Sequence, residues 1–303
     1  MSRPPFLDPP PGVRAYALRT RRGSFAVLDA EPRGPVGTAL LVPGYTGSKE
    51  DFIALLEPLA DAGFRAVAVD GRGQYQSPRG GGRHAYRLGE LAEDVLAQAE
   101  ALPPGGPLHL VGHSLGGLIA RGAVLRATAR RRTPFASLTL IGSGPGRIAR
   151  GSRWRVRALV AGLPVLGPRA MWRLWHPVRD PGITGTFLRR RWLANEPAQV
   201  LVTGRTLRHE PDRVAWLADA GLPVHVLSGE RDGAWPLPQQ DRMARRLGAH
   251  RTVIKGAEHS PNAEQPLPTA AALADFWTGL RPATEAPETP EAPETTEAGS
   301  VTR

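Results

Sequence analysis

Apolar positions along the chain follow two different periods in turn. Short apolar runs of strand length alternate with longer segments in which apolar residues recur at helical spacing. The expected strands are 13–18, 24–29, 38–42, 65–69, 108–111, 137–141, 224–227 and 252–254. The expected helices are 48–62, 91–102, 115–126, 239–247 and 270–280. This alternation predicts an α/β fold with a mainly parallel central sheet flanked by helices, after an opening hairpin.

One long segment, 144–206, has no clear strand and is rich in arginine. We interpret it as an inserted helical segment. Gly162, Pro164, Gly167 and Pro168 interrupt its middle, which favours a hinge between two helices. It also holds four of the seven tryptophans: Trp154, Trp172, Trp175 and Trp192.

The two ends of the chain differ from the body in composition. Residues 1–12 contain five prolines and little to bury, so we expect a flexible leader. Residues 282–303 contain five glutamates, many Pro and Thr, and no aromatic residue. Such a segment cannot offset the entropy of ordering, so we expect a disordered acidic tail. The folded domain should then span 13–281.

Composition excludes several classes of protein. The 303 residues include no Cys, which excludes disulfides, thiolate metal sites and cysteine nucleophiles. The net charge is +11, and all but two of the 39 basic residues are arginines. No zinc finger, basic zipper or RNA-binding signature accompanies that charge, so we expect no nucleic-acid partner. No apolar run approaches membrane-spanning or signal-peptide length, so we expect a cytoplasmic protein without a transmembrane segment.

The sharpest chemical motif is Gly112-His113-Ser114-Leu115-Gly116-Gly117. It follows the apolar run 108–111 and opens the expected helix 115–126, which is the context of a nucleophile elbow. There a serine projects from the sheet edge at a helix N-terminus, where backbone N–H groups favour developing negative charge. We predict that Ser114 is the nucleophile; the alternative is a tight turn with an inert serine.

A serine hydroxyl needs a general base. His259 follows the expected strand 252–254 and lies in the loop at its carboxyl end, where sites of parallel sheets form. The other downstream histidines fit less well, because they lie in or beside the insertion (His176, His209), inside a strand (His225) or at the opposite sheet end (His250). We therefore predict His259 as the base.

The base in turn needs a buried acid. Asp232 lies in the loop after the expected strand 224–227, at the same sheet edge. Glu230 is two residues closer to the strand and remains the second candidate. For the oxyanion hole we predict the backbone N–H groups of Leu115, directly after the nucleophile, and of Tyr45, after Pro43-Gly44. The alternative for Pro43-Gly44 is a simple turn.

These residues together resemble the α/β-hydrolase fold superfamily, of the serine hydrolase or esterase type, over residues 13–281. Asp70-Gly71-Arg72-Gly73-Gln74-Tyr75-Gln76-Ser77 is similar to a family loop, with Tyr75 where Gly is usual. The insertion falls where the family carries its cap. Many members have His-Gly where this chain has Pro43-Gly44, so hydrogen bonds from that His are missing. Ser114 argues against members that use an aspartate nucleophile.

The resemblance implies a serine hydrolase acting on a carboxylic ester, with no metal or organic cofactor. Because fold and triad do not fix the substrate, a thioesterase, an acyltransferase or a C–C bond hydrolase stays open. A different class is a non-catalytic binding or regulatory protein on the same fold. Trp172 and Trp175 are three residues apart and share a helix face, so we expect them either to line an acyl pocket or to pin the cap. Trp and Arg in the insertion also allow contact with a membrane surface. The oligomeric state is left open.

Overall fold

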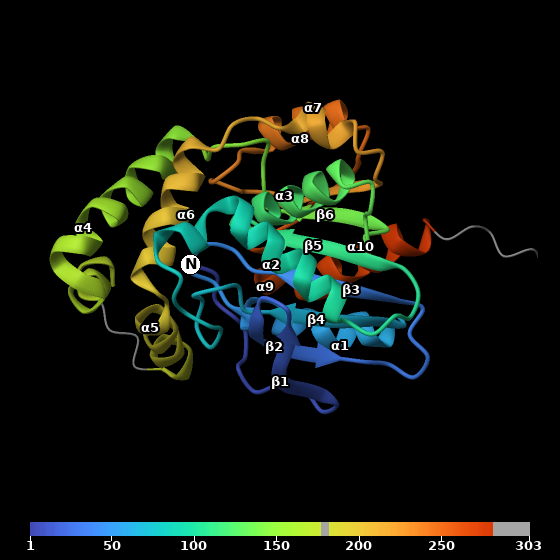
Figure 1. Cartoon of the computed structure of the whole chain (residues 1–303), viewed down its shortest axis with the longest axis horizontal. Helices are drawn as coiled ribbons and strands as arrows, with labels where there is room; N and C mark the ends of the chain where they lie inside the picture. Colours follow the sequence, from blue (N-terminus) through green and yellow to red (C-terminus); the bar gives the residue numbers. More distant parts are fainter. Residues whose placement is uncertain (177–181, 281–303) are drawn as a thin grey trace, which may run out of the picture.

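A single eight-stranded sheet organises the chain, in a computed structural model that describes residues 1–176 and 182–280. Its strand order is β1-β2-β4-β3-β5-β6-β7-β8, and only the pairings of β2 with β1 and β4 are antiparallel (Figure 1). The strands are β1 (Val13–Thr20), β2 (Gly23–Ala30), β3 (Gly37–Val42), β4 (Phe64–Val69), β5 (Leu108–His113), β6 (Ser137–Ile141), β7 (Val224–Gly229) and β8 (His250–Ile254). The predicted α/β fold with a mainly parallel sheet is confirmed.

Helices cover both faces of this sheet. They are η1 (Lys49–Phe52), α1 (Ile53–Asp61), η2 (Arg83–Tyr86), α2 (Leu88–Ala101), α3 (Leu115–Ala129), α4 (Arg150–Trp175), α5 (Ile183–Ala194), α6 (Pro197–His209), α7 (Val214–Ala218), α8 (Leu237–Leu247), α9 (Pro261–Glu264) and α10 (Pro266–Thr278). Leu40 and Val42 of β3 pack in a core with α2 and α3, whereas Ala39 and Leu41 pack in a second core with α1 and α10. Burial of both faces of β3 explains why this strand is a nearly continuous apolar run.

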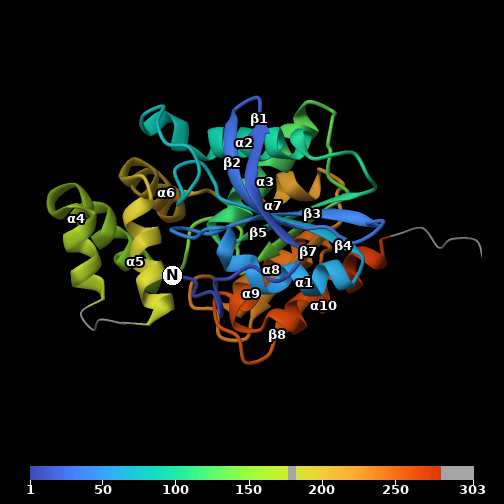
Figure 2. The same cartoon turned by 90° about the horizontal axis from the view of Figure 1, so that it is seen from below.

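The predicted insertion at 144–206 corresponds to α4, α5 and α6, which stand as a separate layer beside the sheet (Figure 2). We call these three helices the cap. Their own apolar cluster includes Leu159 and Leu163 of α4, Trp192 of α5 and Val200 of α6. Helix α4 is interrupted at Gly167, whose φ of 71° and ψ of 168° are not helical.

Buried polar contacts join the cap to the sheet domain. The Arg191 guanidinium of α5 is fully buried and lies 2.6 Å from Asp51 Oδ1 in η1. The backbone N–H of Tyr75 donates to Asn195 Oδ1 at 3.0 Å. Because a buried charge left without its partner is costly, the Arg191–Asp51 pair fixes α5 on the loop region that follows β3.

The predicted leader, residues 1–12, makes contacts that its composition did not indicate. Arg191 Nη2 donates to the backbone carbonyl of Ser2 at 2.8 Å, and Pro4 is buried. Whether this segment is flexible stays a prediction. The predicted acidic tail, 282–303, lies outside the described residues.

Among residues 1–176 and 182–280, no helix is both long enough and apolar enough to cross a bilayer.

Candidate active site

Ser114 stands at the sharp turn between β5 and α3. Its φ of 54° and ψ of −117° lie in a region that residues other than glycine rarely adopt. Its backbone N–H donates to the Ile141 carbonyl of β6 at 2.8 Å, which holds the turn on the neighbouring strand. The observed strained backbone at a strand–helix junction is the geometry that exposes a nucleophile at a sheet edge.

The glycines beside Ser114 are required by close backbone approach. A Cβ atom on Gly112 would lie 2.4 Å from the Gly116 carbonyl oxygen. A Cβ atom on Gly116 would lie 2.2 Å from the carbonyl oxygen of Val42, at the end of β3. A side chain at Gly112 would therefore push the start of α3 away from β5, and one at Gly116 would push the turn away from β3 and the loop that follows it.

The structure brings His259 and Asp232 to Ser114 from two other loops at the same sheet edge. His259 Nε2 lies 2.9 Å from Ser114 Oγ. His259 Nδ1 lies 3.0 Å from Asp232 Oδ1. The three side chains thus form one continuous hydrogen-bonded chain, although Ser114 and His259 are 145 residues apart.

The Asp232 carboxylate is buried and held by further donors. Its Oδ1 accepts from the backbone N–H groups of Ala234 at 2.8 Å and Trp235 at 3.3 Å, and its Oδ2 accepts from Gln240 Nε2 at 3.1 Å. The second candidate, Glu230, is exposed instead, and its Oε2 accepts from the backbone N–H of Gly256 at 3.1 Å. The structure therefore places Asp232, and not Glu230, against His259.

The loop after β3 passes directly beside Ser114. A Cβ atom on Gly44 would lie 3.1 Å from Ser114 Cβ, and the Gly44 carbonyl accepts from Gln74 Nε2 at 2.8 Å. In the described part of the chain, the backbone N–H groups of Tyr45 and Leu115 have no acceptor. Leu115 directly follows Ser114, and Tyr45 directly follows Gly44 beside the turn, so both N–H groups are available as donors.

His113 is a site residue that the sequence analysis did not single out. Its ring is buried beside Ser114, and Nε2–H donates to the backbone carbonyl of His259 at 3.0 Å. Burial, with a smaller contribution from the neighbouring His259, lowers the pKa of His113 to about 4. A neutral His113 therefore holds the His259 loop. Its place beside the nucleophile in the elbow was the only available signal in the sequence.

Residues 70–77, the loop that resembles a family motif, form hydrogen bonds with the segment that follows β3. Asp70 accepts hydrogen bonds from the backbone N–H groups of Lys49 at 2.8 Å and Gln76 at 3.1 Å, so it connects β4 to the segment after Tyr45. Burial raises the pKa of Asp70 to about 7, against the opposing charge of Lys49. Tyr75 has a φ of 35°, which explains in physical terms why glycine is usual at this position.

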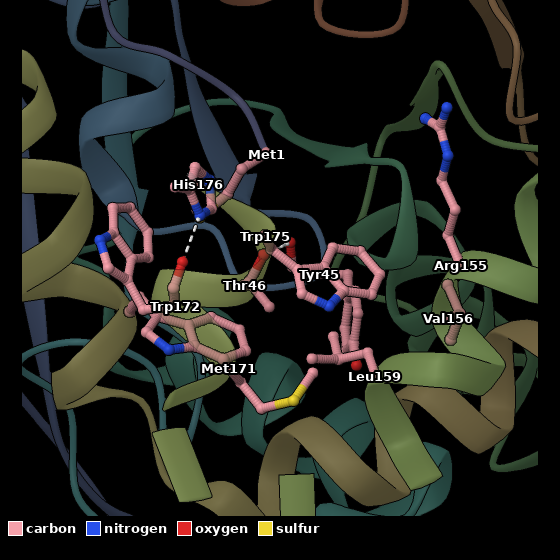
Figure 3. A pocket seen from close by; sticks show the side chains of 11 residues that line it. Met1, Tyr45, Thr46, Arg155, Val156, Leu159, Met171, Trp172, Trp175 and His176 are labelled. Atoms are coloured by element: carbon pink, nitrogen blue, oxygen red, sulfur yellow. Dashed lines mark hydrogen bonds between the residues drawn. The ribbon is translucent and has the colours of Figure 1, made fainter. Parts of the chain in front are cut away.

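An apolar cavity of about 200 Å³ lies between the cap and the Tyr45 loop (Figure 3). Tyr45 and Thr46, from the loop beside Ser114, form one part of the wall, and Met1 and the cap form the rest. The cap residues on the wall are Arg155, Val156, Leu159, Met171, Trp172, Trp175, His176 and Trp192. Trp172 stacks on His176 with ring centroids 3.8 Å apart, and His176 Nδ1–H donates to the Trp172 carbonyl. Both members of the predicted tryptophan pair thus lie on this wall.

Similarity to known proteins identifies the fold. A family model described as alpha/beta hydrolase fold matches residues 39–182. A stretch of 147 residues is 35% identical to "Putative carbamate hydrolase RutD" of Variovorax paradoxus, covering 47% of this chain and 52% of that protein. The chain therefore spans about half the length of this curated relative.

Solved structures match over nearly the whole described fold. A thermophilic esterase from Thermogutta terrifontis superposes with a TM-score of 0.70 at 22% identity, covering 88% of this chain and 99% of that one. The enol-lactonase from Burkholderia xenovorans gives 0.70 at 18% identity, covering 87% and 100%. A membrane phospholipase A described as a bacterial virulence factor gives 0.71 at 25% identity, covering 90% and 88%. The family model and these structures agree, and the chain has the α/β-hydrolase fold.

Proposed function

We propose that this protein is a serine hydrolase that cleaves a carboxylic ester through an acyl-enzyme intermediate. The observation that carries the proposal is the unbroken hydrogen-bonded chain from Ser114 Oγ through His259 to Asp232. A nucleophile, a base and an orienting acid in that geometry define the roles of a catalytic triad on any fold.

In the first half of the reaction, Ser114 Oγ attacks the acyl carbon while His259 Nε2 accepts the hydroxyl proton. The backbone N–H groups of Tyr45 and Leu115 stabilise the oxyanion of the tetrahedral intermediate. His259 then gives its proton to the leaving alkoxide, and the acyl group stays on Ser114. In the second half, His259 activates a water that attacks the acyl-enzyme, which releases the carboxylic acid and restores Ser114.

The hydrogen bonds around Asp232 favour the required tautomer of His259. Three donors besides His259 point at the Asp232 carboxylate, from Ala234, Trp235 and Gln240. This arrangement holds the carboxylate in the position where it accepts the Nδ1–H of His259. Nε2 then carries a lone pair directed at Ser114 and serves as the base.

The cavity beside Tyr45 supports an apolar acyl group as the part of the substrate that is bound. Its walls are mainly Trp, Met, Leu and Val side chains, and its volume of about 200 Å³ suits a short or medium chain. One solved structure with the same fold is described as a membrane phospholipase A, the name of an enzyme class that cleaves acyl esters.

A carbamate is the second candidate substrate, favoured by the 35% identity to the RutD protein of Variovorax. A carbamate presents the same electrophilic carbon to Ser114 but a polar nitrogen in place of the acyl chain. Thioester hydrolysis, acyl transfer and C–C bond cleavage use the same three side chains.

A panel of p-nitrophenyl esters of increasing acyl length, with an alkyl p-nitrophenyl carbamate and an acyl thioester, tests the proposal. We expect ester turnover, with kcat/KM rising with acyl length until the cavity is filled, and loss of turnover in Ser114→Ala. Turnover of the carbamate without the esters would favour the second candidate. No turnover of any substrate would favour a binding protein on the hydrolase fold.

A further inference from the structure

The outward face of α4 carries a stripe of apolar side chains. Trp154, Ala158, Ala161 and Val165 follow one another at steps of four, three and four residues, so they lie on one side of the helix. All four are exposed, Trp154 by 61% and Val165 by 82%. We call these four residues the outer stripe. The opposite side of α4 holds Leu159, Val160 and Leu163, which pack in the cap cluster.

Other exposed apolar side chains extend the outer stripe along the cap. Leu166, Leu174 and Ile183 are exposed by 49%, 65% and 82%. Six of the thirteen large hydrophobic side chains that are exposed in the described residues lie between Trp154 and Ile183. Helix α4 is also at the outer edge of the molecule, away from the sheet, in both views of the fold (Figures 1 and 2). A surface helix with two apolar faces indicates a binding surface on its outer side.

The charged residues of α4 are of one sign. Residues 150–175 contain six arginines and no Asp or Glu. Arg150 and Arg157 flank the outer stripe on one side and Arg155 on the other, with the Arg155 guanidinium 5.7 Å from the Trp154 ring centroid. No arginine of α4 pairs with a carboxylate in residues 1–176 or 182–280. The stripe is therefore edged by guanidinium groups that have no anionic partner within this part of the protein.

We propose that α4 docks the protein on the surface of an anionic lipid bilayer. The outer stripe would enter the boundary between headgroups and acyl chains, and the arginines beside it would meet lipid phosphates. A helix with an apolar stripe, a tryptophan and basic flanks has the composition of an interfacial helix. Tryptophan and arginine suit this boundary because each joins an apolar body to a polar end.

The charge of α4 argues against a second copy of this chain as the partner that binds the outer stripe. In a twofold dimer the same patch meets itself, so the six arginines of each copy would face those of the other. An anionic lipid surface offers opposite charge over the whole area of the patch and accepts apolar side chains without a matching shape.

Docking through α4 would also place the cavity at the lipid surface. Arg155 and Trp175 belong both to the exposed surface of the cap and to the cavity wall, whose far side is Tyr45. The binding itself requires no catalysis, so it is tested separately from the proposed hydrolysis.

The test is co-sedimentation of the full chain carrying Ser114→Ala, which prevents lipid cleavage, with two kinds of vesicle. One kind is phosphatidylcholine alone, and the other contains about one third phosphatidylglycerol. We expect binding to the anionic vesicles that weakens as salt is raised, and at least about tenfold weaker binding to the neutral ones. Equal binding to both kinds, or no binding to the anionic kind, would overturn the proposal.

A matched pair of variants localises the binding. Trp154→Ser combined with Val165→Ser should weaken anionic vesicle binding at least about tenfold, because both side chains leave the interface. Trp216→Ser is the control, since Trp216 of α7 is 59% exposed and lies under Arg213, much as Trp154 lies beside Arg155. An equal loss in the control would overturn the assignment to α4. Light scattering that shows a dimer of the wild type, and a monomer of the α4 variant, would also overturn the proposal. The outer stripe would then be a contact between two copies of the chain.

Discussion

The phenolic hydroxyl of Tyr45 donates a 3.0 Å hydrogen bond to the backbone carbonyl of Val200 in α6. A Cβ atom on Gly204, one helical turn further along α6, would lie 2.7 Å from the Tyr45 hydroxyl oxygen. The residue that we propose as an oxyanion donor through its backbone therefore also fixes the cap through its side chain. Position of the cap and geometry of the oxyanion hole are coupled at this residue.

Tyr45→Phe separates these two roles. The backbone N–H stays, so kcat on a small ester should change by no more than about threefold. The lost hydrogen bond should lower the free energy of unfolding by about 1 kcal/mol, because the phenol is buried against α6. Thermal unfolding and steady-state kinetics measure both effects. A kcat lowered by two orders of magnitude would show that the hydroxyl itself takes part in the reaction.

The two carboxylates after β7 should differ sharply in their effect on turnover. Asp232→Asn removes the anion that accepts the His259 Nδ1–H, so kcat should fall by up to about 10⁴-fold. Glu230→Gln is the matched control, because its carboxylate is exposed and contacts only the backbone of Gly256 within the described structure. The control should retain nearly full activity. If the ranking were reversed, the orienting acid would have to be Glu230.

Replacing both Trp172 and Trp175 with Ala tests whether this pair shapes the cavity or holds the cap in place. Both indoles line the cavity, and Trp175 is 38% exposed while Trp172 is half-buried against His176. We expect kcat/KM to shift toward longer p-nitrophenyl esters, because removing two rings enlarges the cavity. The melting temperature should fall only slightly. A large fall in melting temperature with uniform loss on every ester would mean that the pair pins the cap instead.

Buried histidines should make stability depend on pH. Burial lowers the pKa of His109 to about 4, from 6.5 in an unfolded chain. Between these two values the unfolded chain binds a proton that the folded chain does not, so the free energy of unfolding falls as the pH falls. The contribution of His109 is complete above about pH 6.5, and about 1.4 kcal/mol of it is lost by pH 5.5.

Urea unfolding of the wild type and His109→Gln at pH 7.5 and 5.5 measures this loss. The variant should lose less stability on acidification than the wild type by about 1.4 kcal/mol. The comparison removes the effect of Asp70, whose raised pKa acts in the opposite direction in both proteins. Equal pH dependence in the wild type and His109→Gln would contradict the account.

Local features of the sequence were sufficient to predict the sheet and the arrangement of Ser114, His259 and Asp232. Ser114 and Asp232 follow the buried strands β5 and β7, and His259 follows the edge strand β8. Parallel strands bring their carboxyl ends to one edge. The distinction between Asp232 and Glu230 needed the structure, because both occupy the same short loop. There the direction of each side chain is set by contacts with Trp235, Gln240 and Gly256.

Contacts between distant segments could not be predicted from the sequence. Arg191 is fully buried within an arginine-rich stretch, because it pairs with Asp51, 140 residues earlier. His113 and the Tyr45 phenol likewise acquire their roles from the His259 loop and from α6. Local periodicity does not identify such contacts, because it indicates only which face of a helix or strand is buried.

Covalent labelling shows directly whether Ser114 is the nucleophile. The protein is treated with a fluorophosphonate, which reacts with an activated serine, and the modified peptide is identified by mass spectrometry. We predict one adduct, on Ser114, that is absent from Ser114→Ala and strongly reduced in His259→Ala. An adduct on another residue, or labelling and ester turnover that persist in Ser114→Ala, would contradict the account.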